Sequence, residues 1–401
     1  MHLRRQIVSA IGLCTLAVAG SAAVSAGAAA APDASGHVYV NDNTAIINTI
    51  AGFERHSDGT LTPLEGSPFN AGGAGTGTTV GSQGALQLSG DGRYLLAVDA
   101  GSNQISVLRI RPDGSVRAVE DGTVSSGGVE PISIAVHGNL VFVANEGNAG
   151  SAPNYTGFTL NRGGHLTPIE DSTVTLPSSA NPGDILFNST GTNLIGIEVG
   201  TTVPGTFFID SFAVGRHGQL TRAAGSPFAA QAAGPFGSEF SPTDPAHLYV
   251  SNAHGGDLAG SVSAFSVAHD GTLTSIGGSP YADNQTAPCW VEISHDGRFL
   301  FTVNTASTTI SRYAIQADGS LSLLGSTGFS SGTKGVQPFD ARLDPSGKNL
   351  YVVDAGLPAV SAFAVSGGSL TELVQSPSAL PAGATPFGIV VTSSDQENNQ
   401  D

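Results

Sequence analysis

The sequence predicts an all-β fold, a seven-bladed β-propeller built of four-stranded antiparallel blades. Three observations predict it. One turn phrase recurs seven times, the stretches between its copies alternate apolar and polar residues, and each end of the chain holds the part of a blade that the other end lacks.

The recurring phrase is a glycine turn followed by a short apolar run, first written "DGTLTPLEGSP" at residues 58–68. The glycine at its second position is Gly59, and the equivalent glycines follow at intervals of 48 to 55 residues. They are Gly114, Gly164, Gly218, Gly271, Gly319 and Gly368. A period of this length accommodates one small antiparallel sheet per repeat and is typical of propeller blades.

Each repeat contains four expected strands. An inner strand follows a proline, as in "EPISIAV", and a second strand follows an Asp-Gly turn, as in "SGDGRYLLAVD" at 89–99 and "SHDGRFLFTVN" at 294–304. A third strand alternates strictly, as in "SVSAFSVA", and a short fourth strand follows the turn glycine. Alternation with a period of two, broken by Gly and Asp turns, predicts a four-stranded meander.

The two ends of the propeller predict how the ring closes. Near the start, "GHVYVNDN" matches a second strand that lacks an inner strand before it, whereas "ATPFGIVV" near the end is an inner strand with nothing after it. We expect the C-terminal inner strand to pair with the N-terminal strands, which removes the exposed sheet edges. The propeller then spans residues 37–392, and residues 393–401 form a disordered polar tail.

Residues 1–31 have the pattern of a secretion signal: a basic start, an apolar run and a stretch of small residues. We therefore expect a secreted, extracellular protein. Without this signal the chain carries 13 basic and 32 acidic side chains, a net charge of about −19. Such a surface repels phosphate backbones, so nucleic acid and membrane are not expected as partners. Only Cys289 remains, which excludes an internal disulfide and a thiolate zinc site.

Taken together, the turn phrases and "PCWVEISHDGRFLFTVNTAS" make the chain resemble the lactonase-like seven-bladed propellers. This group contains the propeller-type 6-phosphogluconolactonases and the fungal carboxymuconate-cyclising enzymes, and the resemblance covers residues 37–392. It implies opening or closing of a lactone ring, without a metal or cofactor, in a pocket over the central channel. The family tends to carry His or Arg just after the inner-strand prolines. In this chain those positions are Ile132, Gly183, Phe236, Cys289, Phe339 and Phe387, none of them basic.

One acid or amide ends the second strand of every blade, where the loop to the third strand begins. These residues are Asn41, Asp99, Asn145, Glu198, Asn252, Asn304 and Asp354. They are either ligand-binding residues on one face of the ring or simple turn caps, because Asn and Asp bond readily to nearby backbone. The Gly-rich segment 71–81 is expected to form a flexible loop over the same face.

Departures from this repeat give the candidate site. Glu198 and His254 are predicted as the catalytic pair, since a carboxylate and an imidazole can activate water for attack on a lactone carbonyl. The residues predicted to bind substrate are Asn145, Glu146, Asn252, Trp290, Asn304 and Asp340. Trp290 serves either as a stacking wall over the channel or as a wedge between blades. No metal ligands are predicted.

Two functions follow from these patterns. The first is an exported, monomeric lactonase-like hydrolase acting on an uncharged or weakly polar lactone, so that the expected partner is a small-molecule or sugar ligand. The second is a non-catalytic extracellular propeller that binds a sugar or protein partner, which the missing basic residues favour. The fold alone does not decide between them.

Overall fold

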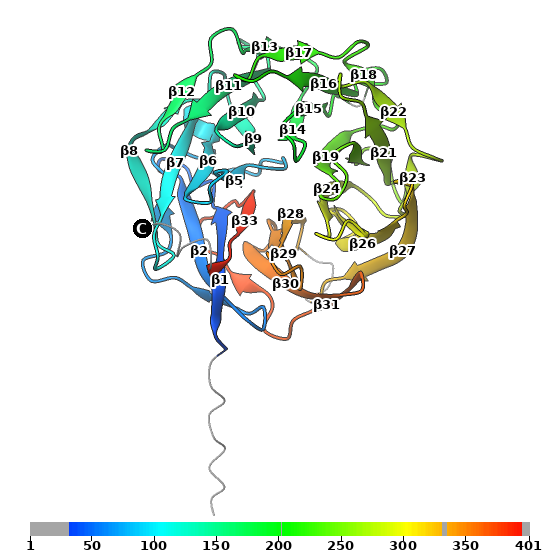
Figure 1. Cartoon of the computed structure of the whole chain (residues 1–401). Helices are drawn as coiled ribbons and strands as arrows, with labels where there is room; N and C mark the ends of the chain where they lie inside the picture. Colours follow the sequence, from blue (N-terminus) through cyan, green and yellow to red (C-terminus); the bar gives the residue numbers. More distant parts are fainter. Residues whose placement is uncertain (1–31, 202, 331–334, 395–401) are drawn as a thin grey trace, which may run out of the picture. The chain divides into compact units, whose positions relative to one another are not determined.

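The structure, a computed structural model, describes residues 32–201, 203–330 and 335–394 (Figure 1). From Asp33 onward the chain forms one compact unit of seven antiparallel sheets arranged around a central channel, which confirms the predicted propeller. The predicted signal (1–31) and residues 395–401 of the predicted tail lie outside the described residues. Within the described residues, no helix has the length and apolar character needed to cross a membrane.

In every blade the strands follow one another from the channel outward. Blade 1 consists of β33 (Ile389–Val391), β1 (Ala34–Asn41), β2 (Thr49–His56), β3 (Leu61–Pro63) and β4 (Phe69–Asn70). Blade 2 consists of β5 (Leu86–Leu88), β6 (Tyr94–Asp99), β7 (Gln104–Ile110) and β8 (Val116–Ser125), with a 3₁₀ turn η1 (Ala100–Ser102) between β6 and β7. Blade 3 consists of β9 (Pro131–His137), β10 (Leu140–Asn145), β11 (Asn154–Leu160), β12 (Leu166–Pro168) and β13 (Val174–Thr175). Blade 4 consists of β14 (Pro182–Phe187), β15 (Asn193–Glu198), β16 (Phe208–Val214), β17 (Leu220–Arg222) and β18 (Phe228–Ala229).

The other three blades follow the same order. Blade 5 consists of β19 (Pro235–Phe240), β20 (His247–Asn252), β21 (Ser261–Val267), β22 (Leu273–Ser275) and β23 (Tyr281–Ala282). Blade 6 consists of β24 (Pro288–Ile293), β25 (Phe299–Asn304), β26 (Thr309–Ile315) and β27 (Leu321–Gly328). Blade 7 consists of β28 (Pro338–Leu343), β29 (Asn349–Asp354), β30 (Ala359–Ser366), β31 (Ser369–Glu372) and β32 (Ser378–Ala379).

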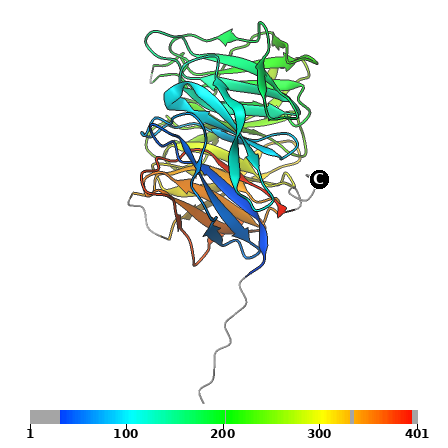
Figure 2. The same ribbon diagram turned by 90° about the vertical axis from the view of Figure 1, so that its left-hand side faces the viewer.

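Ring closure occurs in blade 1, as predicted. β33 pairs antiparallel with β1, with Val38 opposite Val391 and Val40 opposite Ile389. In the side view the red end of the chain lies beside the blue first strands (Figure 2). The ring therefore has no open sheet edge where its two ends meet, which protects it from edge-to-edge association.

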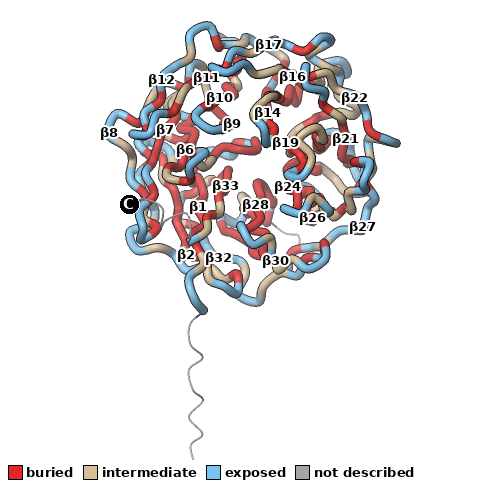
Figure 3. The backbone as a smooth tube through the Cα atoms, in the orientation of Figure 1, coloured by how far each residue is buried: buried red, intermediate tan, exposed pale blue. Residues whose placement is uncertain are grey.

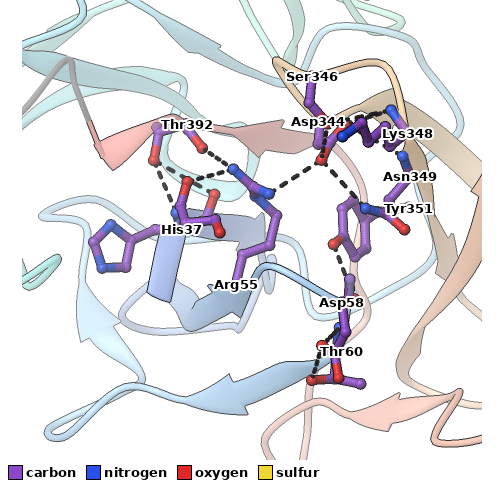
Figure 4. Close-up of polar contacts among 12 residues, drawn as sticks. His37, Arg55, Asp58, Thr60, Asp344, Ser346, Lys348, Asn349, Tyr351 and Thr392 are labelled. Atoms are coloured by element: carbon purple, nitrogen blue, oxygen red, sulfur yellow. Dashed lines mark hydrogen bonds and ion pairs between the residues drawn. The ribbon is translucent and has the colours of Figure 1, made fainter. Parts of the chain in front are cut away.

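A buried arginine reinforces this closure (Figure 4). Arg55 on β2 donates to the carboxylate of Asp344 in blade 7 at 3.1 Å and to the backbone oxygen of Thr392 at 3.2 Å. The side chains of Arg55 and Asp344 are only 5% and 1% exposed. Removing one partner of a charge pair buried this deeply would strongly destabilise the protein. The pair therefore holds the first blade against the last.

The outermost strand shows why the recurring phrase contains a serine. In blades 1, 3, 4, 5 and 7 this strand is split in two, and a serine hydroxyl accepts the backbone N–H of the third strand at 2.7–3.0 Å. The serines are Ser67, Ser172, Ser226, Ser279 and Ser376. In blades 2 and 6, β8 and β27 run unbroken and supply the backbone partner themselves. Apolar residues of the inner three strands form the core, and exposure concentrates in the turns and outer strands (Figure 3).

Candidate active site in the central channel

The central channel is divided by a segment that the sequence predicted only as part of a loop. Residues 79–84, which we call the plug segment, leave the Gly-rich loop and run through the channel into β5 (Figure 1). Ser82 is 0% and Gln83 is 2% exposed. The Gly-rich loop therefore does not simply cover one face, because its continuation fills part of the channel.

Gln83 and Ser82 hold the plug segment to four different blades. Gln83 Nε2 donates to the Ser238 oxygen at 2.7 Å, its Oε1 accepts from the N–H of Val291 at 3.0 Å, and its own N–H donates to the Gly183 oxygen at 3.0 Å. Ser82 Oγ donates to the oxygen of Ile132 at 2.6 Å. These bonds leave one cavity on each side of the plug segment.

The larger cavity, which we call the chamber, lies within the channel and has a volume of about 340 Å³. Gln83 and Gln87 line it beside the plug segment, and Phe187, Pro242 and His295 line it at the far ends of the inner strands. Its wall is strongly polar, because Asp184, Glu239, Glu292 and Arg342 all contribute to it. A volume of this size is within the range of small-molecule sites.

Arg342 is the one arginine or lysine among the described residues that line this wall. Its Nη1 donates to Glu292 Oε2 at 3.1 Å and lies 3.7 Å from Asp340 Oδ1. The other oxygen of Glu292 accepts from the N–H of Leu343 at 3.0 Å. Glu292 is thus fixed at both oxygens, and it fixes the guanidinium in turn.

Burial changes the protonation of the chamber carboxyls. It raises the pKa of Asp184 to about 7, although Ser238 donates to this carboxylate through both its hydroxyl and its N–H. Burial, together with the nearby charge of Glu292, raises the pKa of Glu239 to about 8. Burial also raises the pKa values of Glu292 and Asp340. Such values near neutral pH are those that general acid–base catalysis uses.

Glu239 differs from the other three carboxyls in its contacts. It is half-buried, it lines the chamber, and its carboxyl group forms no hydrogen bond with any residue that the structure describes. Asp184, Glu292 and Asp340 each accept at least one hydrogen bond from the protein. Glu239 is therefore the chamber carboxyl that is available to a bound molecule.

The second cavity, of about 270 Å³, lies on the other side of the plug segment, at the start of the inner strands. Glu130 and Glu146 line it with Val80, Asn181 and Phe236. Burial raises the pKa values of both glutamates, and for Glu146 the charge of Glu130 adds to the effect. The predicted substrate-binding residue Glu146 thus lines a cavity, and its role in substrate binding stays a prediction.

The ring of acids and amides is buried inside the blades. All seven residues are at most 2% exposed, and in six blades the side chain bonds to the third strand of its own blade. In blade 4 Glu198 bonds to Asp210, and five further pairs complete the set. The pairs are Asp99 with Ser106, Asn145 with Asn154, Asn252 with Ser263, Asn304 with Ser311, and Asp354 with Ser361. Asn41 instead accepts from the N–H two residues later in the manner of a turn cap, at 3.0 Å. The contacts of Asn145, Asn252 and Asn304 are therefore internal, and their role in substrate binding stays a prediction.

The predicted catalytic residues occupy different environments. Glu198 is buried beside Asp210 of β16, which forms an ion pair with Arg222. Burial and the hydrogen bond with Asp210 raise the pKa of Glu198 to about 8. His254 is exposed in the loop after β20, where its ring packs against Gly234 and partial burial lowers its pKa. Among the described contacts none joins Glu198 to His254, and their catalytic role stays a prediction.

Trp290 and Asp340 both lie on inner strands. Trp290 is 2% exposed, stacks on Phe339 of blade 7 at 4.5 Å and meets Phe236 of blade 5 edge to face at 5.2 Å. Its Nε1 donates to the Ser82 oxygen at 2.8 Å. These contacts favour the wedge over the stacking wall. Asp340 is fully buried beside Arg342, so it belongs to the chamber cluster.

Four chamber residues, Asp184, Glu239, Glu292 and Arg342, were not among the predicted site residues, although the sequence holds a signal for them. Each follows an inner-strand proline by two or four residues, whereas the predicted catalytic pair came from the ends of the second strands and the family comparison concerned the residue immediately after the proline. Because side chains alternate along a strand, residues at even offsets share a face. Among the described residues no group of three or more His, Cys, Asp or Glu has the arrangement of a metal site.

Comparison with known proteins agrees with this architecture. The family model described as lactonase, 7-bladed beta-propeller, matches residues 37–179 and 218–396. A candidate 6-phosphogluconolactonase from Bacteroides fragilis superimposes with a TM-score of 0.71 at 20% identity, covering 90% of this chain and 99% of its own. A periplasmic gluconolactonase from Pseudomonas aeruginosa gives a TM-score of 0.68 at 18% identity, covering 90% and 99%. No curated protein matches the sequence significantly.

Proposed function

The chain belongs to the lactonase family of seven-bladed β-propellers, and from this membership we propose that it is an exported hydrolase that opens a lactone ring in the chamber of its central channel. One observation carries the proposal. The chamber places a fixed guanidinium, Arg342, in the same wall as a carboxyl group, Glu239, that is available to a bound molecule and has a pKa of about 8.

The chemistry divides between these two residues. Arg342 donates to the lactone carbonyl oxygen and stabilises the negative charge that develops there when water attacks the carbon. Glu239, as the carboxylate, takes a proton from the attacking water. The ring C–O bond then breaks, and the proton held by Glu239 passes to the leaving alkoxide oxygen. The product is an open-chain hydroxy acid, and Glu239 is a carboxylate again.

Glu292 acts as a positioning residue. Its two bonds, to Arg342 at 3.1 Å and to the N–H of Leu343 at 3.0 Å, hold the guanidinium in one orientation before substrate arrives. Such preorganised donors need no rearrangement during the reaction.

The charge of the chamber favours a neutral substrate. Four carboxyl groups, those of Asp184, Glu239, Glu292 and Asp340, accompany a single arginine. A phosphorylated lactone would meet this cluster with like charge, whereas an uncharged lactone would not. The hydroxy-acid product carries a new negative charge, so the same cluster favours its release.

The experiment measures acid release from a panel of lactones by the mature protein, with heat-denatured protein as the control. Glucono-δ-lactone is included because the Pseudomonas aeruginosa relative is described as a gluconolactonase. Glu239→Gln should lower kcat by about a hundredfold or more, the usual contribution of a general base. Glu120→Gln, an exposed carboxyl on β8, is the matched control and should retain full activity.

The pH dependence of kcat/KM gives a second test of the role of Glu239. Because the carboxylate form of Glu239 is required, kcat/KM should rise with pH up to about 8, and Glu239→Gln should abolish that rise. Full activity in Glu239→Gln would refute the assignment of this residue. Absence of activity on every lactone would instead favour the non-catalytic binding propeller.

A further inference from the structure

A second feature lies far from the chamber, on the outer part of blades 2 and 3. Arg109 on β7, Arg117 on β8 and Arg111 in the turn between them are all exposed and line a cavity of about 290 Å³. Tyr94, Ala118, Val119 and Gly163 form the rest of its wall. We name this group of three arginines the arginine patch.

The strand register places these cations close together. Tyr94, Arg109 and Arg117 are direct partners across β6, β7 and β8, so their side chains stand in one row on one face of the blade. Cross-strand partners lie about 5 Å apart, and Arg111, two residues along from Arg109, is displaced by about 7 Å. Like charges placed directly opposite each other destabilise a sheet.

No neighbouring acid forms a direct ion pair with the patch. Among the residues that the structure describes, Arg109, Arg111 and Arg117 form no ion pair, and Arg111 has only a 3.5 Å contact with the Ser115 hydroxyl. Asp113 lies in the same turn. Its carboxylate accepts from Ser115 Oγ and N–H, and these bonds, with a smaller effect of the Arg111 charge, lower its pKa. In the chamber, by contrast, Arg342 is surrounded by carboxyl groups.

Arg162 extends the positive surface, and Arg93 lies beside it in an ion pair with Asp91 at 2.8 Å. Tyr94 Oη and Arg93 Nη2 both donate to the backbone oxygen of Arg162, at 2.9 and 3.0 Å, which fixes the turn of blade 3 against blade 2. A further cavity of about 300 Å³ shares the Tyr94 wall and includes Arg162. Five of the 15 Lys and Arg residues of the whole chain thus lie here, four of them without an ion pair to any described residue, in a protein of net charge −17.

We propose that the arginine patch is a binding site for a ligand that carries two or more oxyanion groups about 5–7 Å apart, such as a phosphorylated or sulfated sugar or a short polyphosphate. Guanidinium groups recognise phosphate, sulfate and carboxylate through paired N–H donors, and three of them in one cavity match several such groups at once. A bound oxyanion would also remove the repulsion between Arg109 and Arg117.

The test uses the mature protein and three probes: orthophosphate, tripolyphosphate and a sulfated disaccharide. Calorimetry should give a Kd at least about tenfold lower for tripolyphosphate or the sulfated disaccharide than for orthophosphate. Arg109→Gln/Arg117→Gln should weaken that binding at least about tenfold. Arg216→Gln/Arg298→Gln removes the same charge from exposed sites on other blades and should leave the affinity unchanged.

Thermal melting separates a binding site from a structural role. The wild type should melt at a higher temperature when the tighter-binding probe is present, whereas Arg109→Gln/Arg117→Gln should melt no lower than the wild type without probe and should show no shift with it. Whichever multivalent probe binds better identifies the source of the oxyanions, a phosphorylated compound or a sulfated glycan. Equal affinity for all three probes, or equal loss in the two double variants, would overturn the proposal.

Discussion

Replacing Asp354 by Asn should make the protein less sensitive to pH between 5 and 8. Asp354 ends β29 and is 2% exposed. Its Oδ2 accepts from Ser361 Oγ at 2.7 Å, and its Oδ1 has no hydrogen-bond partner among the described residues. Burial, with a smaller effect of Glu372, raises the pKa of this carboxyl from 3.8 to about 8.

The direction in which the free energy of unfolding changes with pH depends on whether the folded or the unfolded chain holds the proton. Between pH 4 and 8 the folded protein keeps a proton on Asp354 that the unfolded chain has lost, so the free energy of unfolding falls as pH rises through this window. Each pH unit is worth at most about 1.4 kcal/mol, which gives a ceiling of about 4 kcal/mol between pH 5 and 8. Because buried sites respond as if more polarisable than a dry interior, we expect about 2–3 kcal/mol.

An asparagine fits this site because another blade already has one there. Asn304 of blade 6 ends the equivalent strand, and its amide oxygen accepts from Ser311 Oγ at 2.8 Å, as Asp354 accepts from Ser361. Asp354→Asn should therefore match the wild type within about 1 kcal/mol at pH 5 and exceed it by about 2–3 kcal/mol at pH 8.

Urea unfolding at pH 5, 6, 7 and 8, at constant ionic strength, measures the difference. The other carboxyls whose pKa burial raises, among them Asp42, Asp184, Glu198 and Glu239, remain in both proteins, so the comparison isolates Asp354. Asp318→Asn is the control, because this exposed turn carboxyl has a lowered pKa and does not titrate in the window. Parallel curves for the wild type and Asp354→Asn would refute the reasoning.

Three further predictions concern other parts of the ring. Deleting the chain from Ala384 onward removes β33 and should cause aggregation or a melting temperature at least about 10 °C lower, and an unchanged melting temperature would contradict the role of this closure. Gln83→Ala removes two buried hydrogen bonds of the plug segment and should cost about 2–4 kcal/mol in urea unfolding, whereas Gln87→Ala, in the chamber wall, should cost less than about 1 kcal/mol. If the sequence-predicted pair is catalytic, Glu198→Gln and His254→Asn should each lower lactone turnover about a hundredfold, and full activity in both would leave the chamber as the site.

The fold was predictable because its signals are local. The turn glycine and, in five blades, the serine at the break of the outer strand stand within one stretch such as residues 58–68, and the alternating strands lie directly beside it in the chain. Closure was also readable, since "HVYVN" and "PFGIVV" are each incomplete alone. In each case the residues that interact are neighbours in the chain or the two ends of a repeat.

The chamber was harder to predict because it is assembled from distant residues. Gln83 accepts from Val291, 208 positions along the chain, and nothing in the Gly-rich loop indicates that its continuation enters the channel. The ring of acids and amides was visible in the sequence, but whether those side chains face a ligand or the next strand depends on small polar partners such as Ser106 and Ser361. A serine two residues after the start of the third strand, such as Ser106 or Ser361, is the signal that the carboxyl or amide bonds to that strand and not to a ligand.

Net charge illustrates a different limit of sequence reasoning. A total of −17 argues against polyanionic partners only when charge is averaged over the whole surface. At physiological ionic strength charges more than about 8 Å apart are largely screened, so a ligand at the arginine patch responds to Arg109, Arg111 and Arg117 and much less to acids on other blades. The effect of the net charge and the effect of the arginine patch should be separable in the association and dissociation rates of the ligand. The overall negative field slows the approach of a polyanion at low salt, while the local cations slow its departure. Added salt should therefore raise the association rate toward a plateau and increase the dissociation rate throughout, and a purely basic surface would show the opposite trend in association.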